Sequence, residues 1–173
     1  ADKIDSLFES IASSYNLYLP VDNESGKAEF EQWEKGKKLS SALKAVRSAK
    51  DFFFPKVENL VNYKREGKSI TVVDPRKDLG DFVVFGVRGC DAASFAIIDD
   101  VYLKMDPVDS YYKNRRDHGT VVTLACTDPA QTCFCSTYNI DATNPKGDVT
   151  SWLADGKYFF QANTDKGNAL IEK

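Results

Sequence analysis

Residues 81–103 read DFVVFGVRGCDAASFAIIDDVYL, and their pattern gives the clearest indication of the fold class. It opens with a continuous apolar run at 82–87, which is typical of a strand buried on both faces of a sheet. Gly86 and Gly89 punctuate the end of the run. The pattern therefore predicts a central strand followed by an abrupt change of structure.

A helix is expected directly after this strand. Asp91 or Ser94 can cap its start, and the apolar residues that follow recur at helical spacing, namely Phe95, Ile98 and Val101 or Tyr102. A second apolar run, 120–125, comes after the polar segment DSYYKNRRDHG. Strand, helix and strand in this order form a βαβ crossover, which favours parallel pairing with a right-handed connection.

Shorter elements are expected on both sides of this unit. Residues 3–14 have the spacing of an amphipathic helix, NLYLPV reads as extended with Pro20 at a strand end or edge, and AEFEQW reads as a strand. Ser40 or Ser41 can cap a short helix through Leu43, Val46 and Ala49, and Phe52 to Phe54 are expected in the core. ITVVDP reads as a β-rich run. Near the end of the chain, Asp155-Gly156 marks a hairpin with Tyr158 and Phe160 on one face, and residues 165–172 are expected to start a helix. The predicted fold class is α/β: a mixed sheet containing a parallel βαβ unit, with flanking helices and a C-terminal hairpin, in a single domain spanning 1–173.

The composition excludes several classes of function. The net charge is -3 and the pI is about 5.3, whereas a nucleic-acid-binding protein normally carries a basic stripe. The most basic segment, KGKKLSSALKAVRSAK, is interpreted as a solvated face. No apolar run approaches the roughly 20 residues that cross a bilayer, and the start of the chain lacks the pattern of a signal peptide. Neither nucleic acid nor a membrane is expected as a partner.

The cysteines are the chemically informative residues. Cys90 follows the first predicted strand, Cys126 follows the second directly, and Cys133 and Cys135 lie in the loop that continues from it. Parallel strands deliver their carboxyl ends to one edge of a sheet, where open α/β folds bind ligands. We therefore expect all four sulfur atoms at this edge.

Thiolates crowded together repel one another unless something positive lies among them. An iron–sulfur cluster or a zinc ion supplies that charge, and four cysteines are the number that completes either site. The spacing C-x35-C-x6-C-x-C matches neither the bacterial ferredoxin run nor the paired hooks of zinc ribbons. A cluster on Cys90, Cys126, Cys133 and Cys135, a structural zinc on the same residues, thiols without a ligand, and a disulfide or thiol relay all stay open at this point.

Other polar residues carry weaker signals. His118 lies in a predicted polar loop, where exposure to solvent is expected. Arg88, Arg115 and Arg116 could each lie near a sulfur site or phosphate, or form a surface salt bridge. No hydrolase triad, P-loop or G-x-G-x-x-G sequence is present.

Four segments together resemble one family. They are FFFPKVENLVNYKREGK, FGVRGCDAASFAIIDDVYL, DSYYKNRRDHGTVVTLACTDPAQTCFCS and ADGKYFFQANTDKGNALIE, within residues 50–172. They resemble the amino-terminal region of the iron–sulfur β subunits of sulfhydrogenases (sulfur reductase/hydrogenases) and of the anaerobic sulfite reductase A subunit. Cys90 and Asp91, Cys126, and the Cys133-Phe134-Cys135 triplet match the family's cysteine motifs. After the triplet, STYNIDATNPKGD departs from the family's Met-Gly-rich stretch.

The resemblance implies a cytoplasmic electron-transfer subunit that is not catalytic alone. Such a subunit passes electrons between a flavin subunit that meets a nicotinamide cofactor and a catalytic hydrogenase or sulfite-reducing subunit. In the family a ferredoxin domain with two 4Fe-4S clusters follows this region, so the chain is expected to be a fragment of a longer iron–sulfur protein. The alternatives are a docking domain with zinc or metal-free thiols, and a thiol at Cys133 or Cys135 that carries a persulfide.

Overall fold

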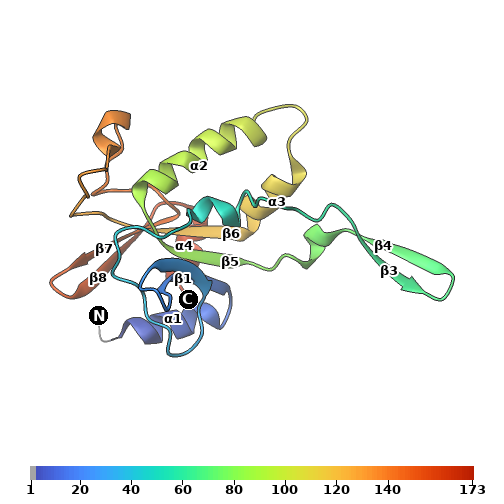
Figure 1. Ribbon diagram of the computed structural model, residues 1–173, viewed down its shortest axis with the longest axis horizontal. Helices are drawn as coiled ribbons and strands as arrows, with labels where there is room; N and C mark the ends of the chain where they lie inside the picture. Colours follow the sequence, from blue (N-terminus) through green and yellow to red (C-terminus); the bar gives the residue numbers. More distant parts are fainter. Residues whose placement is uncertain (1–2) are drawn as a thin grey trace.

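A six-stranded mixed sheet forms the centre of the molecule (Figure 1). The computed structural model describes residues 3–173. The strand order is β2-β1-β5-β6-β7-β8; the four inner strands run parallel, and the outer strands pair antiparallel with their neighbours. The strands are β1 (Asn16–Asp22), β2 (Ala28–Gln32), β5 (Phe82–Val87), β6 (Gly119–Leu124), β7 (Val149–Ala154) and β8 (Lys157–Ala162). The predicted α/β class, with its parallel βαβ unit and C-terminal hairpin, is confirmed.

Strand β5 is buried along its whole length, as its continuous apolar run predicts. Its pairing with β6 shifts register between Phe85 and Val87. Gly86 lies in this bulge at φ 83°, a conformation that glycine adopts without strain. The extra residue reverses the alternation, so that Val87 joins Val84 on one face of the sheet while Phe85 packs on the other.

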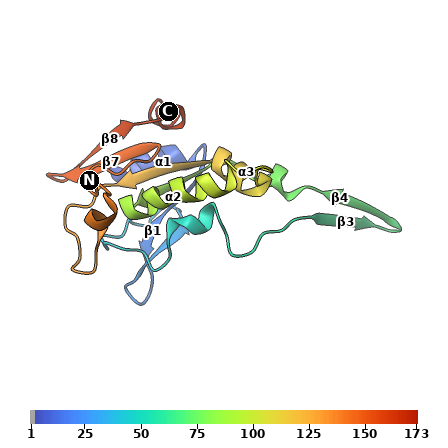
Figure 2. The same ribbon diagram turned by 90° about the horizontal axis from the view of Figure 1, so that it is seen from above.

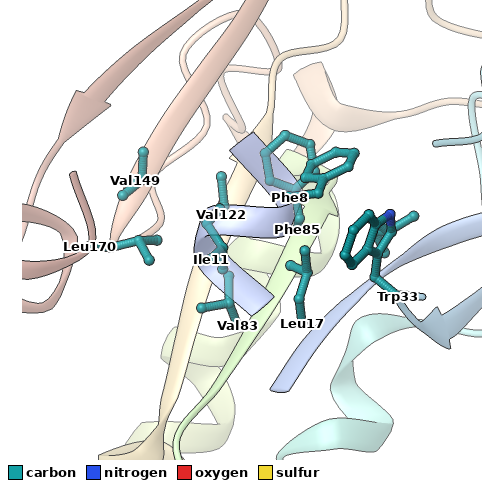
Figure 3. Close-up of a cluster of buried hydrophobic side chains, with 10 residues drawn as sticks. Phe8, Ile11, Leu17, Trp33, Val83, Phe85, Val122, Val149 and Leu170 are labelled. Atoms are coloured by element: carbon teal, nitrogen blue, oxygen red, sulfur yellow. The ribbon is translucent and has the colours of Figure 1, made fainter. Parts of the chain in front are cut away.

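Two pairs of helices cover the two faces of the sheet (Figure 1). Helices α1 (Ile4–Ala12) and α4 (Asp165–Ile171) lie on one face, and α2 (Gly89–Tyr102) and α3 (Ser110–His118) lie on the other. Figure 3 shows the core of the first face, where α1 and α4 meet the inner strands. Its members are Phe8, Ile11, Leu17, Leu19, Trp33, Val83, Phe85, Val122, Val149 and Leu170.

The second core joins α2 and α3 to the sheet through Phe53. This residue follows the short 3-10 helix η1 (Ala49–Phe52) and is 1% exposed. Its ring contacts those of Phe82 and Phe95, at centroid distances of 5.4 and 4.9 Å. Of the three consecutive phenylalanines, only Phe53 is fully buried, since Phe54 is 46% exposed.

The connection from β5 to β6 contains one more helix than predicted. The segment after Asp109 reads as a polar loop, yet it forms α3 because the Asp109 carboxylate accepts hydrogen bonds from the backbone of Tyr111 and Tyr112. His118 is therefore the last residue of a helix and not part of a loop. Its Nδ1 lies 2.7 Å from the Asp81 carboxylate, and its side chain is 36% exposed to solvent.

The short helix predicted through Leu43, Val46 and Ala49 is wrong. Ser40 is buried, and its hydroxyl accepts a hydrogen bond from Ala42 N as in a cap, but no helix follows. Val46 N instead donates to the carbonyl of Ala28, which holds the segment in an irregular path beside β2. Only η1 supplies helical turns there.

The ITVVDP run forms a strand outside the main sheet. Strand β4 (Ser69–Val73) pairs with β3 (Asn62–Glu66) in a two-stranded hairpin, here called the arm. The arm projects from the body of the molecule in both views (Figures 1 and 2). The 3-10 helix η2 (Pro75–Asp78) leads from the arm back toward β5.

The remaining elements agree with expectation. Helices α1 and α4 and strand β2 occur as predicted. At the β7–β8 turn, Asp155 and Gly156 both have positive φ, as a two-residue hairpin loop requires. Tyr158 and Phe160 stack on one face at 6.2 Å, and both contact Phe85. Strand β1 lies inside the sheet, but it pairs with β5 only at 16–18, so Pro20 lies beyond the part that pairs with β5 and is opposite Phe30 of β2.

Candidate functional site

A cysteine-lined pocket lies beside the first turns of α2, next to the edge of the sheet where β5 and β6 end. Cys90 is the second residue of α2, and Cys135 begins the 3-10 helix η3 (Cys135–Tyr138) in the long loop after β6. Together with Cys133, these residues line one pocket of about 460 Å³. Cysteines from segments more than 40 residues apart in the sequence therefore line one pocket.

Cys126 is placed differently from the other three cysteines. It follows β6 directly, as predicted, and its backbone N–H donates to the carbonyl of Ala142 at 2.8 Å. It does not belong to the lining of the cysteine pocket. All four thiols are free. Three of the four predicted site residues thus come together, and Cys126 lies outside the lining.

The charges around Cys90 favour its protonated form. The residue is exposed, but partial burial of the thiol raises its pKa above the usual value, and electrostatic interactions with Asp91 and Cys135 raise it further. Backbone N–H groups at the start of α2 act in the opposite direction without reversing the effect. In the free protein Cys90 is therefore a thiol at neutral pH, and binding through its thiolate would release a proton.

Asp91 fixes the start of α2 against the segment before Phe53. Its carboxylate accepts hydrogen bonds from Ser48 Oγ at 2.8 Å, from Lys50 Nζ at 3.2 Å and from Ala49 N at 3.3 Å. It was expected as one of two candidate caps of the helix, but α2 already begins at Gly89. The bonds of Asp91 tie the first turn of α2, which carries Cys90, to the segment at 48–50.

Arg88 joins three segments at this edge of the sheet. Its guanidinium donates to the carbonyl oxygens of Ala125, at the end of β6, and of Ala42, each at 3.2 Å. These bonds use the fork of donors that arginine provides. Arg88 therefore connects the end of β5 to the end of β6, and Cys90 and Cys126 lie just after these two strand ends.

The other two arginines form salt bridges, which was one of their two predicted roles. Arg115 binds the Glu58 carboxylate with two bonds of 2.8 Å, and Arg116 binds Asp99 with bonds of 2.8 and 2.9 Å. Both pairs are about three quarters buried. The two pairs connect α3 to the segment before the arm and to α2, and neither arginine lines the cysteine pocket.

Apolar and basic side chains complete the pocket. Phe134 and Tyr138 are more than half exposed, and their rings contact each other at 5.9 Å. Lys44 lines the same pocket, and its Nζ donates to Thr132 Oγ1 at 3.3 Å. The pocket therefore combines three cysteine side chains with an aromatic rim and one amine, and thiolates are the ligands that soft metals and iron–sulfur clusters prefer.

The helical spacing of the residues after Cys90 predicts which side chains of α2 line the pocket, whereas no sequence pattern predicts Lys44. Ala93, Ser94 and Ile97 stand three, four and seven positions after Cys90, which puts them on the same side of α2. Lys44 comes from the irregular segment, whose path depends on tertiary contacts. No local pattern could have assigned it to the pocket.

The described donors form no ready-made site for a single metal ion. A zinc ion needs its ligands to meet at one point, with sulfur atoms about 2.3 Å from the metal. Among residues 3–173, no three cysteine, histidine or carboxylate side chains are grouped closely enough for this. A cluster distributes its thiolates over several irons, so it does not require the same convergence on one point.

Comparison with known proteins gives one informative similarity. No family model matches the chain, and no solved structure matches it. None of the helices in the described part of the chain is long and apolar enough to cross a membrane. Over 110 residues, or 63% of its length, the chain is 33% identical to the protein named sulfhydrogenase 2 subunit beta of Pyrococcus furiosus. The match spans 31% of that protein, so this chain is similar to about a third of a hydrogenase β subunit.

Proposed function

We propose that this chain is a domain of an iron–sulfur electron-transfer subunit in a multi-subunit oxidoreductase of the hydrogenase type. The similarity to a sulfhydrogenase β subunit supports the class of complex. The observation that carries the proposal is the pocket shared by Cys90, Cys133 and Cys135. Its proposed partners are a flavin- and nicotinamide-binding subunit and a catalytic hydrogenase or sulfite-reducing subunit, in the cytoplasm. The domain is not catalytic alone.

The proposed ligand of the pocket is an iron–sulfur cluster. Three thiols on one largely apolar pocket fit the donor chemistry of a cluster, while the fourth predicted ligand, Cys126, would have to enter from outside the present lining. When bound, a cluster supplies one-electron redox chemistry. A site of Cys90, Cys133 and Cys135, with Cys126 as a fourth ligand, stays our proposal for the complete set.

The residues around the pocket have separable tasks in this scheme. Cys90 would bind as a thiolate, so it must give up the proton that its surroundings favour. Lys44 would offset part of the negative charge of the thiolates. Phe134 and Tyr138 would limit the access of water to sulfur, which is one of the factors that set a cluster's reduction potential.

Iron and sulfide analysis tests the proposal. The chain is purified without oxygen, reconstituted with iron and sulfide, and compared with the variants Cys133→Ser and Cys126→Ser. We expect wild-type protein to bind iron and acid-labile sulfide and to give an EPR signal on reduction. Cys133→Ser should lose at least nine tenths of the iron, because a thiolate inside the pocket is removed.

Cys126→Ser is the matched comparison, and it measures whether the fourth cysteine belongs to the site. A loss as large as that of Cys133→Ser would show that the loop after β6 closes around the cluster. Retention of iron would define a site of three cysteines. Wild-type protein that stays colourless and free of iron after reconstitution would overturn the proposal.

A second candidate is a docking domain with metal-free thiols. It is favoured by the lack, within residues 3–173, of any group of side chains suited to one metal ion. In this case reconstitution yields no iron, and Cys133→Ser leaves both folding and assembly unchanged. Stoichiometric zinc in the purified chain would instead support the structural-zinc alternative.

A further inference from the structure

The arm carries an apolar face that nothing in the described chain covers. Tyr63 is opposite Val72 in the hairpin, and Arg65 is opposite Ile70, so these four side chains lie on one face. The three uncharged ones are 66% to 74% exposed. A two-stranded hairpin alone is only marginally stable in water, and packing against another surface is what normally stabilises one.

The base of the arm is fixed to the body. Glu58 is held by two bonds from Arg115, and the Leu60 carbonyl accepts a hydrogen bond from the hydroxyl of Tyr111 at 2.5 Å. After the return strand, Arg76 of η2 binds Asp74 and also donates to Ser110 at 2.6 Å. Ser110, Tyr111 and Arg115 all belong to α3. The arm is therefore anchored at its base while it extends away from the molecule (Figure 2).

The outer face of α2 has a matching apolar strip. Ile97 and Val101 are four positions apart on the helix, and Met105 follows just after its end. They are exposed by 69%, 51% and 63%. The Asp100 carboxylate stands beside them and is paired only with the highly exposed Lys104. This strip thus combines exposed apolar side chains with a negative charge.

The two surfaces carry opposite charge. Residues 62–73 contain Lys64, Arg65 and Lys68 against Glu66, a net charge of +2. In residues 93–109, Asp99 is paired with Arg116 and partly buried, and the other three aspartates stand against Lys104, a net charge of -2. Complementary charge around an apolar centre is the arrangement expected of two surfaces that bind each other. The arm points away from its own body, so it can reach the α2 strip only on another molecule.

We propose that the protein forms a symmetric homodimer in which the arm of each copy lies on the outer face of α2 of the other. A two-fold axis makes the contact twice, since each copy supplies one arm and one strip. Tyr63, Ile70 and Val72 then cover Ile97, Val101 and Met105, and Arg65 lies near Asp100. Ile97 also lines the cysteine pocket, so an arm on the strip reaches the rim of that pocket. The oligomeric state tests the dimer, and the iron analysis tests the pocket, so the two proposals can fail separately.

Sedimentation equilibrium of the chain tests the dimer. The variant Tyr63→Ser/Val72→Ser removes the apolar face of the arm, and Asn62→Ser/Thr71→Ser alters the opposite face of the same strands. We expect the first to weaken dimerisation by about 100-fold or more, because each substitution acts at both contacts, and the second by less than about threefold. The arm contributes nothing to either core, so both variants should keep the melting temperature of the body.

A charge exchange identifies the surface on which the arm lies. Arg65→Asp and Asp100→Arg should each weaken the dimer by about tenfold, and the double variant should recover most of the loss because both contacts regain an opposite pair. The proposal is overturned if the chain is a monomer at about 100 μM. It is also overturned if a dimer forms that the apolar arm variant does not weaken, or if the double charge variant is weaker than both single ones.

Discussion

Phe53→Ala is expected to lower the free energy of unfolding by about 3–5 kcal/mol, the usual cost of truncating a fully buried phenylalanine. The ring is 1% exposed and fills the space between the sheet and α2. A Cβ atom at Gly119 would stand only 2.3 Å from Phe53 Cε1, so the neighbouring backbone already packs tightly around this ring. Urea denaturation of the variant measures the loss as a lower midpoint.

Phe54→Ala is the matched control for this prediction. Phe54 is the next residue, but it is 46% exposed, and its ring contact is with Tyr102 at 4.9 Å. We expect its truncation to cost less than half as much as that of Phe53, since part of the ring is already in water. Equal losses for the two variants would contradict the assignment of Phe53 as the residue that fills the second core.

Asp99→Ala is expected to destabilise the protein by about 2–4 kcal/mol, because it leaves partly buried groups without their partner. Asp99 accepts two bonds from Arg116 and one from the hydroxyl of Tyr112 at 2.6 Å. The Arg116 guanidinium also lies over the ring of Phe53 at 5.1 Å. This network joins α2, which carries Cys90, to α3. Thermal and urea unfolding of the variant measure its contribution.

Asp100→Ala provides the comparison for Asp99→Ala. Asp100 is the next residue on α2, and its ion pair with Lys104 is largely exposed. Surface pairs of this kind contribute about 0–1 kcal/mol, so the expected change is small when unfolding is measured at a protein concentration low enough to keep the chain monomeric. A large loss for Asp100→Ala, with little effect of Asp99→Ala, would contradict the role given to the network.

The same network makes the stability of the protein depend on pH in the alkaline range. Burial raises the pKa of Tyr112 well above its usual value, and the hydrogen bond and charge of Asp99 add to the effect. The unfolded chain therefore loses this proton first, at about pH 10. The stabilisation is fully present below that pH and is lost as the pH rises beyond it. Tyr112→Phe should remove this part of the pH dependence.

The sequence predicted the parts of the fold that depend on strong local patterns. The apolar run of β5 and the helical spacing after Cys90 are signals of this kind, and both elements formed. The helix α3 was missed because it has only one buried residue, Tyr112, and its cap at Asp109 is a weak signal on its own. The irregular path near Ser40 was also missed, because contacts with β1 and β2 decide it.

The candidate site was predicted from topology and not from spacing. Parallel pairing of β5 and β6 places the segment that carries Cys90 beside the loop that carries Cys133 and Cys135. Whether Cys126 also faces the pocket depends on the course of the loop after β6, which no periodic pattern describes. The arm could not be foreseen either, since the ITVVDP run reads the same in a central sheet and in a projecting hairpin.

Thiol cross-linking tests the shared pocket most directly. The variant Cys126→Ser/Cys133→Ser keeps only Cys90 and Cys135, and Cys90→Ser/Cys133→Ser keeps only Cys126 and Cys135. Each folded variant is treated in the absence of oxygen with a short reagent that cross-links two thiols. The cross-linked peptides are then identified by mass spectrometry. We predict that Cys90 and Cys135 are joined within one chain faster than Cys126 and Cys135, although they lie 45 residues apart and the other pair only 9. A rapid link between Cys126 and Cys135, with none to Cys90, would contradict the shared pocket.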